Sequence, residues 1–223
     1  MKTVERIADD WLLATEIQKL EARLWRGVKR DRTQVVLMTS AVRGEGKTTT
    51  TAYLATALAM HPERRIAIVD LDFREPRINA HFECEVRHGI GEVLAGRGAL
   101  PAAIIKTELP QLDLALPVPG GEDPGLLRRA REIGETFDHF RSHYDLTLVD
   151  APALLPVADT SAILPHTDGV LLVAMAGKTT KPHLNRAREI CLGLNANILG
   201  LIVGNLKEAA PEYVDSGYYY GYR

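Results

Sequence analysis

The sequence predicts an α/β fold, with a mostly parallel β-sheet flanked by helices on both faces. Six short runs rich in Val, Ile and Leu alternate along the chain with segments of helical periodicity. The runs are almost continuously apolar, which is typical of strands that are buried on both faces. Such strands are usually parallel and are joined by helices that cover the sheet.

Each apolar run and each helical segment has definite bounds. The strands are expected at 35–40, 65–72, 112–117, 146–152, 169–176 and 196–205, and the helices near 47–60, 89–95, 124–141, 156–165 and 180–194. A further amphipathic helix at about 3–28 is predicted from apolar residues at helical spacing, namely Val4, Ile7, Trp11, Ala14, Ile17, Leu20, Leu24 and Val28. One apolar stripe needs only one surface, so this helix is expected to pack on its own domain.

The composition is that of one ordinary globular domain. Of the 223 residues, 46% are hydrophobic and 25% are charged, which is enough for one substantial core. The net charge of −2 gives no strong basic field, so nucleic acid is not an expected partner. No apolar segment has the length of a signal peptide or a membrane span. We therefore expect one domain at 1–206, located in the cytoplasm unless a partner recruits it.

A glycine-rich loop separates the first core strand from the next helix. The stretch SAVRGEGKTTTTAYLA, residues 40–55, has the spacing G-x-x-x-x-G-K-[ST] of a phosphate-binding loop, with Ala41 in place of the first Gly. In such loops backbone N–H groups hold a polyphosphate, the Lys reaches the β- and γ-phosphates, and the hydroxyl ligates Mg²⁺. A chance glycine-rich turn is the alternative, which the flanking strand and helix disfavour. The predicted nucleotide-binding residues are Arg43, Gly44, Glu45, Gly46, Lys47, Thr48 and Thr49.

Three aspartates end strands that are expected to reach the same edge of the sheet. Asp70 and Asp72 follow one apolar run, and Asp150 follows another. Ligands of parallel sheets bind at the carboxyl ends of the strands, and Mg²⁺ prefers oxygen ligands. Any one of these aspartates could be a helix cap or a turn residue, but three beside a phosphate loop favour a metal site. Mg²⁺ is therefore expected at Thr48, Asp70, Asp72 and Asp150.

The C-terminus carries a concentration of tyrosines. Adjacent tyrosines cannot all face a core, and the Gly, Ser and Asp residues among them favour a mobile end, so 207–223 is expected to be a flexible tail. With a phosphate-binding loop in the same chain, the tail hydroxyls become predicted phosphoacceptors. A low-complexity aromatic tail without chemistry is the alternative. Five of the seven tyrosines lie in this tail: Tyr213, Tyr218, Tyr219, Tyr220 and Tyr222.

The motifs GEGKT, VDLDFREPR and LVDAP, together with the tail, resemble those of the bacterial tyrosine kinases of capsular and exopolysaccharide synthesis. These kinases belong to the wider MinD/ParA class of P-loop ATPases, and the likeness runs from about residue 16 to the C-terminus. The resemblance implies a MinD/ParA-like P-loop fold, ATP and Mg²⁺ as cofactors, and a contact of Asn205 with adenine. It also implies a homo-oligomer and a membrane-bound polysaccharide copolymerase-type activator, which would recruit the protein to the inner face of the cell membrane.

Several positions depart from these families. MinD and ParA proteins usually carry K-G-G-x-G-K-T, whose first lysine corresponds to Val42 here, so its absence favours the kinases. The kinases often have proline at the positions of Arg43 and Ala153, and the assembly motif E-x-x-R-x-x-R of their first helix is matched only in part by 16–22. Two alternatives stay open: a MinD/ParA-like ATPase, and a catalytically weak, nucleotide-gated scaffold of a membrane export complex.

The predicted reaction is ATP-dependent phosphorylation of tyrosines on the chain's own tail, in trans. Lys47 and Mg²⁺ are expected to spread the charge of the transferring γ-phosphoryl group. Asp70 is the predicted base for the tyrosine hydroxyl, and Asp72 is the alternative. Because free tyrosine has a pKa of about 10, alignment and late proton removal must replace prior ionisation.

Overall fold

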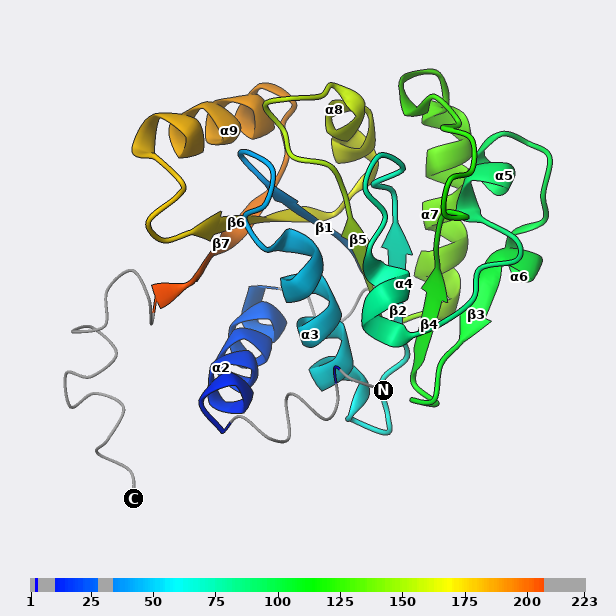
Figure 1. Ribbon diagram of the computed structural model, residues 1–223, viewed down its shortest axis with the longest axis horizontal. Helices are drawn as coiled ribbons and strands as arrows, with labels where there is room; N and C mark the ends of the chain where they lie inside the picture. Colours follow the sequence, from blue (N-terminus) through cyan, green and yellow to red (C-terminus); the bar gives the residue numbers. More distant parts are fainter. Residues whose placement is uncertain (1–2, 4–10, 28–33, 207–223) are drawn as a thin grey trace.

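The computed structural model describes residues 3, 11–27 and 34–206 (Figure 1). In this part of the chain seven strands form one sheet in the order β3-β4-β2-β5-β1-β6-β7. All neighbouring strands are parallel except β3 and β4, which are antiparallel. The predicted mostly parallel sheet is confirmed. The strands are β1 Gln34–Ser40, β2 Ile66–Asp70, β3 Ile104–Lys106, β4 Leu112–Ala115, β5 Leu146–Asp150, β6 Gly169–Met175 and β7 Ile198–Gly204.

The helices occupy the expected stretches, with two interruptions. Arg129 has the non-helical angles φ −120 and ψ 26, so the segment expected at 124–141 divides into η1 and α7. A second division falls in 156–165, where α8 ends at Ile163 and a 3₁₀ turn begins at Leu164. Its second residue, Pro165, has no N–H for a helical hydrogen bond. The short elements α4, α6 and β3 were not predicted. The helices are α2 Trp11–Gly27, α3 Lys47–Ala59, α4 Ile78–Phe82, α5 Ile90–Leu94, α6 Leu100–Ala103, η1 Leu126–Arg128, α7 Ala130–His143, α8 Asp159–Ile163, η2 Leu164–His166 and α9 Lys181–Gly193.

The sheet separates two hydrophobic cores, because successive strand residues point to opposite faces. Val35 and Leu37 of β1 face a core built with α5, α7 and α9, whereas Val36 and Met38 face a core built with α3 and α4. The molecule is therefore a three-layer arrangement, with helices on both faces of the sheet (Figure 1). This arrangement leaves the carboxyl ends of the parallel strands as the edge where loops can build a site.

Helix α2 packs against α3 on one face of the sheet. Ile17 lies in a small apolar cluster with Tyr53 and Ala57 of α3. At the same contact the Glu21 carboxylate accepts a hydrogen bond from Arg64, with 2.6 Å between Oε1 and Nη1. The described part of the amphipathic helix therefore packs on its own domain, as expected.

Several predicted features lie outside the described residues. The tail 207–223, with all five phosphoacceptor tyrosines, is one of them. The ends of the N-terminal helix predicted at about 3–28, with Val4, Ile7 and Val28, are another. Of the described helices, none combines the length and the apolar character needed to cross a membrane.

Candidate nucleotide-binding site

The loop between β1 and α3 has the backbone of an anion-binding loop. Gly44 and Gly46 have φ of +72° and +85°, the left-handed region that glycine adopts without strain. Gly46 caps α3 with no side-chain hydrogen bond. The first N–H groups of α3, from Lys47 onward, are therefore available to an anion, and the dipole of the helix favours one.

The aspartates predicted from β2 and β5 meet beside this loop. Because β2 and β5 are parallel neighbours, Asp70 and Asp150 are paired in register across the two strands. Both side chains are buried, and the Thr48 hydroxyl donates a hydrogen bond of 2.7 Å to Oδ2 of Asp150. One oxygen of each carboxylate, Oδ2 of Asp70 and Oδ1 of Asp150, is buried and has no hydrogen-bond partner among the residues that the structure describes. Two buried carboxylates with unpaired oxygens on neighbouring strands are costly unless a cation or a proton balances their negative charge.

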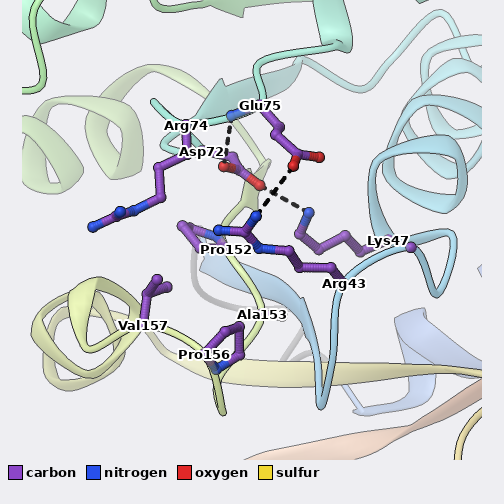
Figure 2. Close-up of a pocket in the computed structure, with 10 residues that line it drawn as sticks. Arg43, Lys47, Asp72, Arg74, Glu75, Pro152, Ala153, Pro156 and Val157 are labelled. Carbon is purple, nitrogen blue, oxygen red and sulfur yellow. Dashed lines mark hydrogen bonds and ion pairs between the residues drawn. The ribbon is translucent and has the colours of Figure 1, made fainter.

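Lys47 and Asp72 form an ion pair above these buried acids. The distance between Nζ of Lys47 and Oδ2 of Asp72 is 2.9 Å, and the other Asp72 oxygen accepts the backbone N–H of Glu75 at 3.2 Å (Figure 2). A hydrogen bond of 2.9 Å from the Asp72 N–H to Oδ1 of Asp70 links the last residue of β2 to the acid that follows it. The P-loop lysine is thereby held at the edge of β2, over the acids.

The ion pair lies in a cleft beside the phosphate-binding loop. Asp72 lines this cleft, whereas Asp70 and Asp150 lie beneath its surface. Arg43 approaches Glu75 at 3.4 Å across the cleft, and Arg74 is held by Asp159 at 3.1 Å. The lining residues are Arg43, Gly44, Lys47, Asp72, Arg74, Glu75, Pro152, Ala153, Pro156 and Val157 (Figure 2).

The pKa values of the buried groups reflect this crowding of charge. Burial raises the pKa of Asp150 to about 6, although Lys47 and the Thr48 hydroxyl oppose the rise. Burial and the charge of Asp150 hold the pKa of Asp70 well above its usual range. Burial alone would lower the pKa of Lys47, but the attraction of Asp150, Asp72 and Asp70 outweighs it and raises that pKa. The site therefore keeps a charged lysine and has acids that favour a proton when no cation balances them.

The donor set fits Mg²⁺ held together with phosphate. In the described part of the chain, no three His, Cys, Asp or Glu side chains form a complete metal site. Mg²⁺ needs no such cage, because it usually keeps several waters and takes one or two protein oxygens together with phosphate oxygens. The Thr48 hydroxyl and the unpaired oxygens of Asp70 and Asp150 are of the required type.

The structure brings together five of the predicted site residues, whereas the predicted phosphoacceptor tyrosines lie outside the described residues. Lys47, Thr48, Asp70, Asp72 and Asp150 converge at the carboxyl edge of β2, β1 and β5. The exposed Thr49 follows in the first turn of α3. Asn205 directly follows β7, two strands away from β1, and its Nδ2 donates to the Ala176 carbonyl at 3.4 Å. Its φ of +62° is one that asparagine tolerates better than most residues.

One predicted residue has a different orientation from the others. The Glu45 side chain is only 1% exposed and turns into the loop, where Oε2 accepts the Val42 N–H at 2.9 Å. Its other oxygen accepts the hydroxyl of Thr179, which in turn accepts the Met175 N–H at 2.8 Å. The carboxylate therefore shapes the loop, and only the backbone of Glu45 can face a phosphate.

The loop between β6 and α9 was not predicted to belong to the site. Thr179 holds Glu45, and Lys178 donates from Nζ to the Gly44 carbonyl at 3.0 Å. These contacts span 134 positions of sequence. The only signal in the sequence is that AGKTT follows a strand adjacent to β1, and that adjacency is known only from the sheet order.

Known proteins are similar to this chain in sequence and in fold. A family model described as cellulose biosynthesis protein BcsQ matches residues 34–199. The tyrosine-protein kinase YwqD of Bacillus subtilis is 30% identical over 184 residues, which are 82% of this chain and 76% of that protein. The putative tyrosine-protein kinase EpsB of Ralstonia solanacearum is 26% identical over 98% of this chain, but the match spans 29% of EpsB.

Solved structures agree with these relatives. The kinase domain of the Escherichia coli tyrosine kinase ETK superposes with a TM-score of 0.78 at 26% identity, covering 84% of this chain and 73% of that one. MinD of Pyrococcus horikoshii in complex with Mg-ADP gives 0.68 at 25% identity, covering 82% and 76%. The chain therefore belongs to the MinD/ParA-like P-loop ATPases matched by the BcsQ model and, among them, to the bacterial tyrosine kinases.

Proposed function

We propose that this protein is an ATP-dependent protein-tyrosine kinase that phosphorylates the tyrosines of its own C-terminal tail in trans. The observation that carries the proposal is the convergence of a P-loop lysine, a P-loop hydroxyl and three aspartates at one edge of the sheet. This set suits phosphoryl transfer, in which the protein mainly positions the reactants and balances their charge. Tyrosine is proposed as the acceptor because five tyrosines lie in the last eleven residues and because relatives are named tyrosine-protein kinases.

The proposed reaction transfers the γ-phosphoryl group of ATP to a tyrosine oxygen. A bond forms between that oxygen and the γ-phosphorus, while the bond from this phosphorus to the β,γ-bridging oxygen breaks and its electron pair leaves with ADP. Lys47 is held at the phosphate end of the loop and offsets the charge on the transferring group. Mg²⁺, when held by Thr48 and Asp150, would supply further neutralisation of the phosphates.

Asp70 is the proposed acceptor of the tyrosine proton. Its Oδ2 is unpaired, and its pKa is raised well above the usual range, so its affinity for a proton is high. Asp72 remains the alternative, because it lines the cleft while Asp70 lies beneath the surface. The two differ in their present partners: Asp72 would have to give up its ion pair with Lys47, whereas the free oxygen of Asp70 has no bond to lose.

The biological setting is proposed from the family. We propose a role in the synthesis or export of an exopolysaccharide, supported by the match to a cellulose biosynthesis family. Relatives such as EpsB extend far beyond the matched region. A separate membrane-bound activator of the copolymerase type, a homo-oligomeric assembly and recruitment to the inner face of the membrane are parts of the same proposal.

Transfer in trans is tested by mixing two defective chains. The first is full-length Lys47→Met, which carries a tail but cannot transfer, and the second is an active chain without residues 211–223. Incubation with labelled ATP and Mg²⁺ should label the full-length variant only when both chains are present. A full-length variant that stays unlabelled in every mixture would contradict transfer in trans.

A MinD/ParA-like ATPase is the second candidate, favoured by the likeness to MinD bound to Mg-ADP. It predicts release of phosphate from ATP with no phosphotyrosine on either chain. Measuring free phosphate and phosphotyrosine in the same samples separates the two functions, because the kinase moves label into protein and the ATPase moves it into solution.

A further inference from the structure

The loop at 176–180 borders the phosphate-binding loop on the side away from the aspartates. In the sheet, β5 and β2 follow β1 in one direction, and β6 and β7 follow it in the other. The acids leave β2 and β5, whereas the 176–180 loop leaves β6. The proposed transfer needs the γ-phosphoryl group to face Lys47 and the acids, and a nucleotide bound in this way would extend its sugar end toward β6 and β7.

Lys178 brings a positive charge to this second side. Its Nζ donates to the Gly44 carbonyl at 3.0 Å. A Cβ at position 44 would lie 2.6 Å from that Nζ, so the close approach depends on a glycine there. Among the described residues Lys178 has no carboxylate within ion-pair distance. An ammonium has three donors, and this contact uses one of them. The side chain is exposed, and its remaining donors are free for a ligand.

The backbone around Lys178 is fixed in place from both directions. Thr179 ties the loop to Glu45 of the phosphate-binding loop and to the Met175 N–H. On the other side the Ala176 N–H donates to the Gly204 carbonyl at 2.9 Å. A lysine on a loop held at both ends loses less conformational freedom on binding than one on a free loop. The loop therefore carries its charge at a set position beside the nucleotide site.

We propose that Lys178 is a nucleotide-binding residue that contacts the α-phosphate and sugar end of ATP. This contact is made equally to ATP and ADP, and it contributes to binding but not to phosphoryl transfer. It adds a cation to the phosphate-binding loop from the side of β6, beside Arg43 and Lys47 of the loop itself. The inference rests on the nucleotide-binding part of the proposed function and is independent of which group accepts the phosphate.

The test is calorimetric titration of full-length protein with ADP and with a non-hydrolysable ATP analogue, each with Mg²⁺. Lys178→Met should weaken both ligands about tenfold, because a charge-assisted hydrogen bond is lost. The matched control is Lys181→Met, three residues along the chain at the start of α9, which should bind like wild type. Lys178→Arg retains the charge and should recover most of the affinity. Raising the salt concentration should narrow the difference between wild type and Lys178→Met.

Three results would overturn the proposal. Unchanged affinity in Lys178→Met would remove Lys178 from the site. A loss for the ATP analogue with none for ADP would place its contact on the γ-phosphate. The third result is that ligand-free Lys178→Met melts well below wild type and that Lys178→Arg does not restore nucleotide affinity. It would show that the lysine only supports the Gly44 loop. Because these are binding and stability measurements, a protein that binds nucleotide but forms no phosphotyrosine would contradict the proposed function and leave this inference standing.

Discussion

Replacing Asp150 by asparagine should stabilise the ligand-free protein and abolish its stabilisation by Mg²⁺ with nucleotide. Asp150 is buried beside Asp70, and its pKa rises from 3.8 to about 6. The folded state thus binds this proton more tightly than the unfolded state does, so stability falls as the pH rises from about 4 through about 6. Two pKa units at about 1.4 kcal/mol each make the cost of the ionised carboxylate about 3 kcal/mol near pH 8.

Asparagine removes this cost but brings a new one. Its amide oxygen can still accept the Thr48 hydroxyl, while its NH₂ group takes the place of the unpaired oxygen and needs an acceptor, at a cost of about 1–2 kcal/mol. The net gain is about 1–2 kcal/mol at pH 8, or a rise in melting temperature of roughly 2–8 °C for a chain of this size. Below pH 4 the gain disappears, because aspartate is then protonated in both states.

The assay is thermal unfolding at several pH values, with and without Mg-ADP. Mg-ADP should raise the melting temperature of wild type but not of Asp150→Asn, which reverses the order of the two proteins. Asp138→Asn is the matched control, because Asp138 is an exposed aspartate on α7 and its substitution should leave the pH profile unchanged. An Asp150→Asn protein that is less stable than wild type at pH 8, by the same amount as at pH 5, would refute this account of the site.

Further predictions concern the catalytic groups and the tail. Lys47→Met should reduce phosphotyrosine formation by roughly 10²-fold or more, while its circular dichroism spectrum stays that of wild type. Undiminished activity in this variant would contradict the assignment of the site. In wild type, kcat/KM should fall as the pH drops through the raised pKa of Asp70, because the base becomes protonated. Asp70→Asn should abolish this fall, whereas Asp72→Asn should retain it. The reverse result would make Asp72 the base. Phosphorylation of the tail, at about −1.5 to −2 charges per tyrosine, should dissociate the oligomer in light scattering, and a fully phosphorylated protein with the mass of the unmodified oligomer would contradict this.

The sequence predicted the fold well where strands are long and apolar. The runs at 35–40 and 169–176 became β1 and β6 within a residue of the expected bounds, because a strand that is buried on both faces forms a nearly continuous apolar run in the sequence. The strand β3 could not be found in this way. It has three residues, is half-buried or exposed, and joins the sheet antiparallel to β4 at the edge, so its stability comes from pairing and not from its own composition.

The acids of the site were predictable because their positions follow from strand order alone. Any aspartate at the carboxyl end of a parallel strand reaches the same edge, and Asp70 and Asp150 did so on neighbouring strands. Their difference in burial could not be predicted from the sequence. Asp72 lines the cleft, and Asp70 and Asp150 lie beneath it, a difference that sequence spacing does not encode.

The Glu45–Thr179 contact shows why the phosphate-binding motif alone describes this loop incompletely. In the motif G-x-x-x-x-G-K-[ST] the residue before the last glycine is unspecified, so Glu45 was predicted only as one of the nucleotide-binding residues of the loop. In the structure its carboxylate closes the loop on itself through Val42 and joins it to β6 through Thr179. A buried carboxylate with both oxygens bonded tolerates little movement. The phosphate-binding loop and the 176–180 loop are therefore one structural unit, and a nucleotide that moves the first must also move the backbone that leads from β6 toward α9.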